Sequence, residues 1–207
     1  MVARRKVTIN GKPAVLGSKV EKNDRVEVAG GKYVKHYKYF AYYKPVGIIT
    51  SAPGEGERDI AQSVRIPGVF PIGRLDKDSE GLMILTDDGR ITDRLLNPAR
   101  VHEKEYQVQV KDELRSSFKR KMEAGVNIEG YETKPCRVTI VNDSTFRVTL
   151  TEGKRHQIRR MCAALFQEVK SLRRIRIGNI ALGKLSPNGY RPIEGAELAA
   201  FLKDLGL

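Results

Sequence analysis

The densest group of residues capable of chemistry lies in the segment GRLDKDSEGLMILTDDG, residues 73–89. Five of its residues fall at positions 1, 3, 5, 6 and 12 of a calcium-binding EF-hand loop, namely Asp76, Asp78, Glu80, Gly81 and Asp87. An EF-hand needs a helix on each side, whereas Pro71 and Gly73 precede this segment and the apolar run LMILT inside it predicts a buried strand. The sequence therefore argues against a calcium site.

Two other interpretations of these carboxylates stay open. Asp76 paired with Asp78 or Glu80 would suit a glycosidase, but the chain has no Trp and is strongly cationic, unlike a sugar-binding cleft. Alternatively, Asp76 is a single catalytic carboxylate, held on a tight turn between buried strands with Arg74 two residues before it. From this segment alone, an Asp that merely caps a turn is the better explanation.

A second cluster, EGKRHQIRRMCAALF at residues 152–166, changes that balance. Its apolar residues recur at helical spacing and predict a core-facing stripe of Ile158, Met161, Cys162 and Leu165. Arg155 and Arg159 then lie one turn apart, with His156 and Arg160 beside them. Because cations at a helix N-terminus oppose the helix dipole, this placement indicates a bound anion, either a phosphate or a carboxylate such as Asp76. A solvated basic face is the alternative, and it is weakened by the arginines that follow in LRRIRIGN, Arg173, Arg174 and Arg176.

The formal charge of +13 is concentrated in two segments. Residues 1–40 and residues 151–190 each carry +7, and the remaining 127 residues are nearly neutral. Two separated basic segments favour a polyanion held at two places, most commonly nucleic acid. For the first segment, a Lys-rich surface that only maintains solubility explains the pattern equally well.

The elements that must position these residues predict an α+β fold. Strands come in runs with helices interspersed irregularly, which favours a mixed, mainly antiparallel sheet with flanking helices. Helices are expected over residues 60–64 (capped by Asp59), 90–98, 112–125, 154–166 and 196–205, and a hairpin over residues 136–153. We expect a small β unit at residues 1–34 and the main domain at residues 35–207.

The composition also bears on where in the cell the protein is found. No run approaches the roughly 20 apolar residues that span a bilayer, and the N-terminus lacks the apolar stretch of a signal peptide. We therefore expect a soluble cytoplasmic protein with no membrane contact. The two cysteines, Cys136 and Cys162, lack CxxC spacing and a neighbouring His pair, so they predict buried thiols and no metal site.

The order of four motifs, GRLDKDSEGLMILTDDG, HEKEYQV, EGKRHQIRRM and RRIRIGN, resembles the RsuA/RluB/RluE/RluF branch of the pseudouridine synthases. The resemblance runs from about Phe40 to Ile193. It implies an isomerase without cofactor or metal that breaks the N1–C1′ bond of one uridine in RNA, rotates the base and rejoins it through C5. The implied substrate is large-subunit (23S) ribosomal RNA. A tRNA anticodon-arm uridine is the rival, and a non-catalytic ribosome-assembly factor is the alternative from another class.

The resemblance also implies roles for individual residues. Asp76 would attack the base or the ribose, and Arg159 would pair with Asp76 and keep it ionised. Tyr106 would stack on the flipped base, while Arg74 would fill the space that the base vacates; a uridine in folded RNA must leave its stack to expose C1′ and C5. We expect the other basic residues to contact RNA: Arg155, His156, Arg160, Arg173, Arg174, Lys32 and Lys35. Residues 1–34 resemble only the β half of an S4-like RNA-binding domain, and we expect a monomer.

Overall fold

In the computed structural model the chain divides into two units, Met1–His36 and Tyr37–Leu207. The structure describes residues 2, 6–29, 36–97 and 100–207. The first unit contains a three-stranded antiparallel sheet in the order β2-β1-β3, with β1 at Val7–Ile9, β2 at Lys12–Pro13 and β3 at Val26–Val28. A small β unit was expected here, although its second strand was predicted at residues 14–16. Its S4-like identity stays a prediction, and Lys32 and Lys35 lie outside the described residues.

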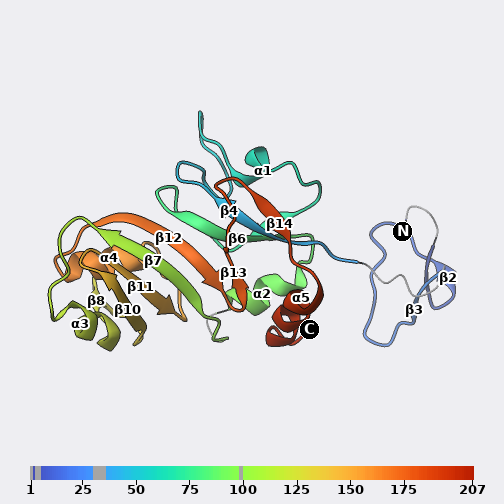
Figure 1. Ribbon diagram of the computed structural model, residues 1–207. Helices are drawn as coiled ribbons and strands as arrows, with labels where there is room; N and C mark the ends of the chain where they lie inside the picture. The colour runs from blue at the N-terminus through green and yellow to red at the C-terminus, as the bar shows by residue number, and fades with distance from the viewer. Residues whose placement is uncertain (1, 3–5, 30–35, 98–99) are drawn as a thin grey trace. The chain divides into compact units, whose positions relative to one another are not determined.

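The second unit is built on one large sheet with the strand order β10-β11-β7-β12-β6-β4-β14, while β5 and β13 pair with β6 and β12. The strands are β4 (Tyr39–Lys44), β5 (Phe70–Ile72), β6 (Glu80–Thr86), β7 (Lys104–Val110), β10 (Arg137–Asn142), β11 (Thr145–Leu150), β12 (Val169–Ile177), β13 (Ile180–Ala181) and β14 (Tyr190–Pro192). Among these pairs only β12 and β6 run parallel. A separate hairpin joins β8 (Asn127–Ile128) to β9 (Tyr131–Glu132). The predicted mixed, mainly antiparallel sheet is confirmed (Figure 1).

Five helices accompany the described strands: α1 (Ile60–Ser63), α2 (Arg90–Leu96), α3 (Phe118–Ala124), α4 (Gln157–Ala164) and α5 (Gly195–Asp204). Asp59 caps α1 as predicted, because its carboxylate accepts a hydrogen bond from the Gln62 N–H at 2.9 Å. Helix α3 begins later than predicted, since the Leu114 N–H bonds to the Asp143 carbonyl in the β10–β11 turn. None of the helices in the described part of the chain is long and apolar enough to cross a bilayer.

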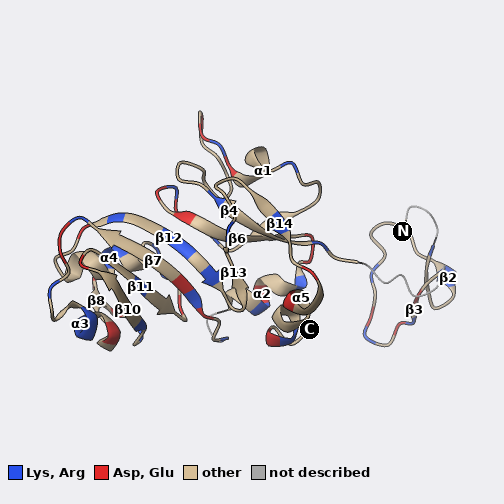
Figure 2. Cartoon of the chain, in the orientation of Figure 1, with Lys and Arg blue, Asp and Glu red and all other residues tan. Residues whose placement is uncertain are grey.

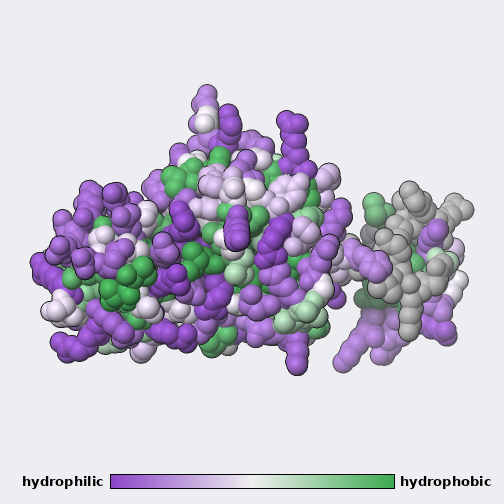
Figure 3. Space-filling view, viewed as in Figure 1, coloured by the Kyte–Doolittle hydropathy of each residue, from purple (hydrophilic) through white to green (hydrophobic). Residues whose placement is uncertain are grey.

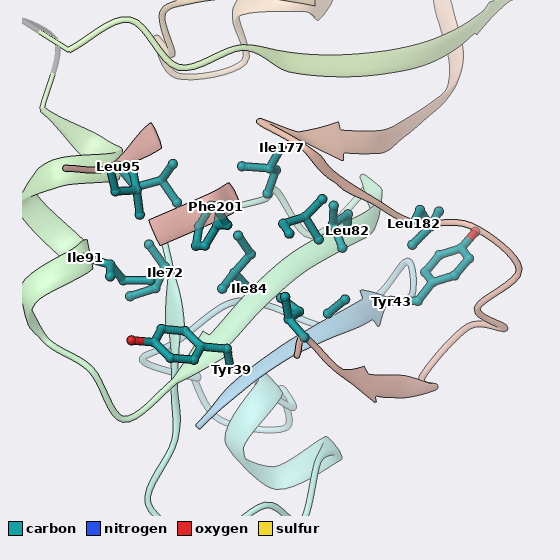
Figure 4. Packing of buried hydrophobic residues seen from close by; sticks show 14 residues of the cluster. Tyr39, Tyr43, Ile72, Leu82, Ile84, Ile91, Leu95, Ile177, Leu182 and Phe201 are labelled. Carbon is teal, nitrogen blue, oxygen red and sulfur yellow. The ribbon is translucent and has the colours of Figure 1, made fainter. Parts of the chain in front are cut away.

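Separate cores support the two halves of the large sheet. In one, Leu82 and Ile84 of β6 pack against α2 and α5 through residues such as Ile91 and Phe201 (Figure 4). In the other, strands β7, β10 and β11 pack against α3 and α4. The predicted stripe of α4 is confirmed, because Ile158, Met161 and Cys162 are buried there and Leu165 packs against them. The β6 half has a further apolar cluster that includes Tyr42, Met83 and Leu85, and Tyr106 of the other half packs against it.

The two halves meet where β12 lies beside β6. Their parallel register contains two residue pairs, Arg173 with Glu80 and Arg174 with Gly81. Gly81 has a φ of +113°, and a Cβ added to it would lie 2.3 Å from the Arg174 carbonyl oxygen. Only a residue without a side chain allows the strands to approach this closely. We call this contact the seam.

A methyl group added at the seam should destabilise the folded protein more than a methyl group added at a glycine in open space. Gly81→Ala should lower the free energy of unfolding by about 2 kcal/mol or more, since it introduces both a backbone clash and strain at positive φ. The matched control is Gly89→Ala, because Gly89 has a φ of −63° and open space around its Cβ position. Urea unfolding of both variants measures the difference, and equal stabilities would contradict the close approach.

Candidate active site

Asp76 lies on the turn between β5 and β6, and neighbouring segments hold its backbone. The buried Thr50 hydroxyl accepts from the Leu75 N–H at 3.1 Å and donates to the Leu75 carbonyl at 3.0 Å. The Ser79 N–H closes the turn on the Asp76 carbonyl, and the Gly47 N–H bonds to the Lys77 carbonyl. Asp76 is therefore fixed at its main chain while a third of its side chain stays exposed.

Two hollows, each of about 500 Å³, meet at Asp76. The first is lined from both halves of the sheet and includes Lys104 and Tyr106 of β7. The second extends along residues 49–52 and 77–78. Both share Arg74, Asp76, Arg155 and His156, so the segments predicted to carry the chemistry converge on one carboxylate.

His156 lies beside Asp76, with 3.5 Å between its Nε2 and the Asp76 Oδ1. Its backbone is in the left-handed region, at φ +51° and ψ +28°, immediately before α4 begins. For a residue other than glycine this conformation costs about 1–3 kcal/mol and is most often kept at functional sites. The expectation for His156 was an RNA contact. The structure instead brings it next to the candidate catalytic carboxylate.

Arg159 reaches the same turn at a different atom from the one expected. Its Nη2 donates to the Asp78 carbonyl oxygen at 2.8 Å, and no ion pair between Arg159 and Asp76 occurs among the described residues. The guanidinium extends from the first turn of α4 to the main chain of the loop two residues beyond Asp76. Arg159 therefore connects α4 to the Asp76 turn, and its catalytic role stays a prediction.

Arg174 does not occupy the exposed position that a phosphate contact requires. It is only 3% exposed, and its guanidinium donates to the carbonyl oxygens of Leu82 at 2.7 Å and Arg74 at 3.3 Å. The predicted contact between Arg174 and RNA therefore does not fit the structure. Successive residues of β12 face opposite sides of the sheet, so Arg173 is exposed while Arg174 is buried. Arg174 is buried under the Asp76 turn, where it supports the backbone that leads to Asp76.

The other arginines that we expect to contact RNA differ in whether their charge is already paired with an acidic side chain. Arg173 pairs with Glu80 at 2.8 Å, and Arg160 pairs with Glu129 at 2.7 Å. Arg74 and Arg155 are exposed at the hollows and form no ion pair within the described part of the chain. These two arginines are thus the more available partners for an anion.

Charge and polarity of the surface suit a polar ligand. Lys and Arg recur along β12, and Arg176 of this strand is paired in register with Glu105, the acidic residue of β7 (Figure 2). The face of the second unit seen in Figure 3 is largely hydrophilic, with apolar side chains in separate groups. Such a surface favours contacts through charge and hydrogen bonds over contacts through a broad apolar patch.

Sequence reasoning missed Lys44, which is fully buried at the end of β4. Its Nζ donates to the carbonyl oxygens of Pro45 at 2.9 Å and Ile48 at 2.5 Å. Burial lowers the pKa of Lys44 to about 8, and the negative charge of Asp76 partly opposes that shift. Burial and the Arg174 charge also lower the pKa of Lys104 in the first hollow. The available signal for Lys44 was a lysine closing the strand-like run YFAYYKP.

The cysteines and carboxylates offer little alternative chemistry. Cys162 is buried, as predicted, and burial raises its pKa to about 12. Cys136 is only half-buried, and its Sγ donates to the Met122 carbonyl. Across the described ranges no three His, Cys, Asp or Glu side chains are grouped as metal ligands. Residues 80–86 of the EF-hand-like segment form strand β6, which is incompatible with a calcium loop.

Comparisons with known proteins agree on one family for this chain. Residues 38–164 match the family described as RNA pseudouridylate synthase. The dual-specificity RNA pseudouridine synthase RluF of Escherichia coli K12 is 40% identical over 206 residues, which cover 95% of this chain and 70% of that protein. The ribosomal large subunit pseudouridine synthase B of Bacillus subtilis is 35% identical, over 84% of this chain and 76% of that protein. A crystal structure of a pseudouridylate synthase superimposes with a TM-score of 0.75 at 29% identity, covering 99% and 90% of the two chains.

The lowered pKa of Lys44 predicts a pH-dependent contribution to stability. Below pH 8 the Lys44 side chain is protonated in both the folded and the unfolded state. Between about pH 8 and the ordinary pKa of 10.5, Lys44 keeps its proton in the unfolded state and releases it in the folded state. The free energy of unfolding of the wild type, relative to Lys44→Met, should therefore increase as the pH rises above 8. Urea unfolding of both proteins between pH 7 and 9.5 measures this, and a constant difference would contradict the assigned pKa.

Proposed function

Because this chain belongs to the RNA pseudouridylate synthase family, we propose that it converts one uridine of large-subunit (23S) ribosomal RNA to pseudouridine, with Asp76 as the catalytic carboxylate. The observation that carries the proposal is the position of Asp76, where two hollows meet and basic side chains from both halves of the sheet converge. The choice of large-subunit RNA is supported by the name of the Bacillus subtilis relative.

The reaction is an isomerisation, so no atom is gained or lost overall. The N1–C1′ bond breaks, the base rotates, a C5–C1′ bond forms, and C5 loses a proton while N1 gains one. A carboxylate that attacks the base or C1′ of the ribose is bonded to that one fragment while the N1–C1′ bond is broken, and this bond to the carboxylate breaks again before the product leaves. We infer that Asp76 does this, since Thr50 holds the main chain of the preceding Leu75, the Ser79 N–H bonds to the Asp76 carbonyl, and the Asp76 side chain lines the hollows.

The surrounding residues fit a flipped nucleotide. Tyr106 lines the same hollow as Asp76 and offers an aromatic face to the extruded base, while the exposed Arg74 is placed to fill the gap in the RNA helix. Arg155 at the rim would contact phosphate, as an arginine without an ion pair is free to do. Arg159 would orient the Asp76 turn through the Asp78 carbonyl.

We also propose RNA contacts, an oligomeric state and a cellular location for this protein. Lys32 and Lys35 would bind the RNA backbone, and the first unit would be an S4-like RNA-binding domain. We expect a monomer that acts in the cytoplasm, where its RNA is made, and that uses no cofactor or metal. Support for RNA binding also comes from the charge of +7 in each of the two basic segments.

Asp76→Asn tests the catalytic assignment. The variant should bind 23S ribosomal RNA like the wild type, because an amide of the same shape replaces the carboxylate, but it should form no pseudouridine. Chemical labelling of pseudouridine followed by reverse-transcription stops measures the product, and filter binding measures affinity. Asp112→Asn is the control, since it changes the net charge equally at an exposed residue outside the hollows.

Pseudouridine formation by Asp76→Asn at the wild-type rate would exclude Asp76 as the nucleophile. Absence of product from both the wild type and the control on every RNA tested would instead favour a non-catalytic RNA-binding factor.

A further inference from the structure

Glu152, which follows β11 in the wall of the first hollow, joins two parts of the chain that sequence reasoning did not connect. Its Oε2 accepts a hydrogen bond from the Tyr131 hydroxyl at 2.7 Å. Its Oε1 accepts from the Lys134 main-chain N–H at 3.1 Å and from the Gln157 Nε2 at 2.6 Å. One carboxylate thus binds donors from the β9 region and from the first residue of α4.

Gln157 transmits this constraint to the loop before α4. It is 4% exposed, and its Oε1 accepts a hydrogen bond from the Lys154 N–H at 2.9 Å. Its own main-chain N–H bonds back to the Lys154 carbonyl at 3.2 Å. Residues 154–157 are therefore closed into a tight turn at both the side chain and the main chain, and the two residues in the middle of this turn are Arg155 and His156, both exposed.

That turn sets the position of His156 opposite Asp76. The left-handed conformation of His156, at φ +51°, is unfavourable for a residue with a side chain, so the surrounding bonds must maintain it. Two sets of bonds do this: the His156 carbonyl accepts from the Arg160 N–H at 2.9 Å, and Gln157, bonded to Glu152, closes the turn that contains His156. Without Glu152, the Gln157 amide loses its carboxylate acceptor at a buried position, which is costly.

From these contacts we propose that Glu152 is a positioning residue of the pseudouridine synthase reaction: it acts through Gln157 to hold His156 and Arg155 in the arrangement that faces Asp76. The inference rests on the proposed function. Glu152 touches neither Asp76 nor His156 by a hydrogen bond, so its effect is on geometry and not on the reacting atoms.

The charge of Glu152 is not what the cluster uses. No Lys or Arg in the described part of the chain forms an ion pair with it, and its three partners are hydrogen-bond donors. A glutamine at this position keeps one oxygen for the Lys134 N–H and the Gln157 amide. Its NH₂ group then donates to the Tyr131 hydroxyl, which accepts as well as donates. Glu152→Gln should consequently restore what Glu152→Ala loses.

The experiment is a single-turnover reaction on 23S ribosomal RNA transcribed with uridine tritiated at C5, because formation of the C5–C1′ bond releases that hydrogen. At saturating enzyme, Glu152→Ala should slow tritium release about tenfold or more, as a small displacement near the reacting atoms can do, with the RNA dissociation constant changed less than about threefold. Glu152→Gln should react within about threefold of the wild type, since the hydrogen-bond geometry is kept. Glu132→Ala is the matched control, an exposed acid on β9 next to Tyr131.

The outcomes separate the two proposals. If the wild type releases no tritium from any ribosomal or transfer RNA, the proposed function fails and this inference fails with it. If the wild type is active and Glu152→Ala reacts at the same rate, or loses affinity without losing rate, the positioning role alone is overturned. A slow Glu152→Gln also overturns it, because the acceptor geometry would then not suffice.

Circular dichroism shows whether each variant folds. Should Glu152→Ala fail to fold, Glu152→Asp replaces it, because the shorter side chain withdraws the acceptor from its donors while keeping the charge. The slower rate is then expected of Glu152→Asp, and a folded Glu152→Asp with the wild-type rate would overturn the positioning role.

Discussion

The close approach of β12 to β6 is the constraint on which the rest of this structure depends. Two residue pairs join the halves of the sheet, and Gly81 allows the strands to meet because it has no side chain. Asp76 belongs to the β6 half, whereas Tyr106 and His156 belong to the other. The distance between Asp76 and the opposite wall of the first hollow is thus set where the strands touch, and Arg174 reinforces that contact by donating to carbonyls on the β6 side.

The seam also explains why so many cations surround one carboxylate. Arg174 and Lys44 are buried and donate to main-chain oxygens, so they hold loops and create a positive interior below Asp76. Arg74 and Arg155 are exposed and remain available to an anionic ligand. Cations of the same type therefore divide between supporting the backbone and facing the hollows, according to which side of a strand or turn they occupy.

Sequence patterns could predict what depends on local periodicity or on the order of motifs. The alternation in KEYQVQV, the apolar run of β6 and the stripe of α4 correspond to observed elements, and the order of motifs identified the family. The pattern could not show that Arg174 is buried and Arg173 exposed, because that depends on which distant residues fold against each face of β12. The left-handed turn at His156 and the bonds of Glu152 likewise depend on residues brought together only by folding.

We propose that this chain uses Asp76 to make pseudouridine in large-subunit ribosomal RNA. The most direct test is pseudouridine mapping of all ribosomal and transfer RNA from host cells that lack the gene, with and without a plasmid copy of the wild type or of Asp76→Asn. We expect one large-subunit uridine to be unmodified in the deletion strain and only the wild-type copy to restore its modification. An unchanged map in the deletion strain, or restoration by Asp76→Asn, would contradict the account.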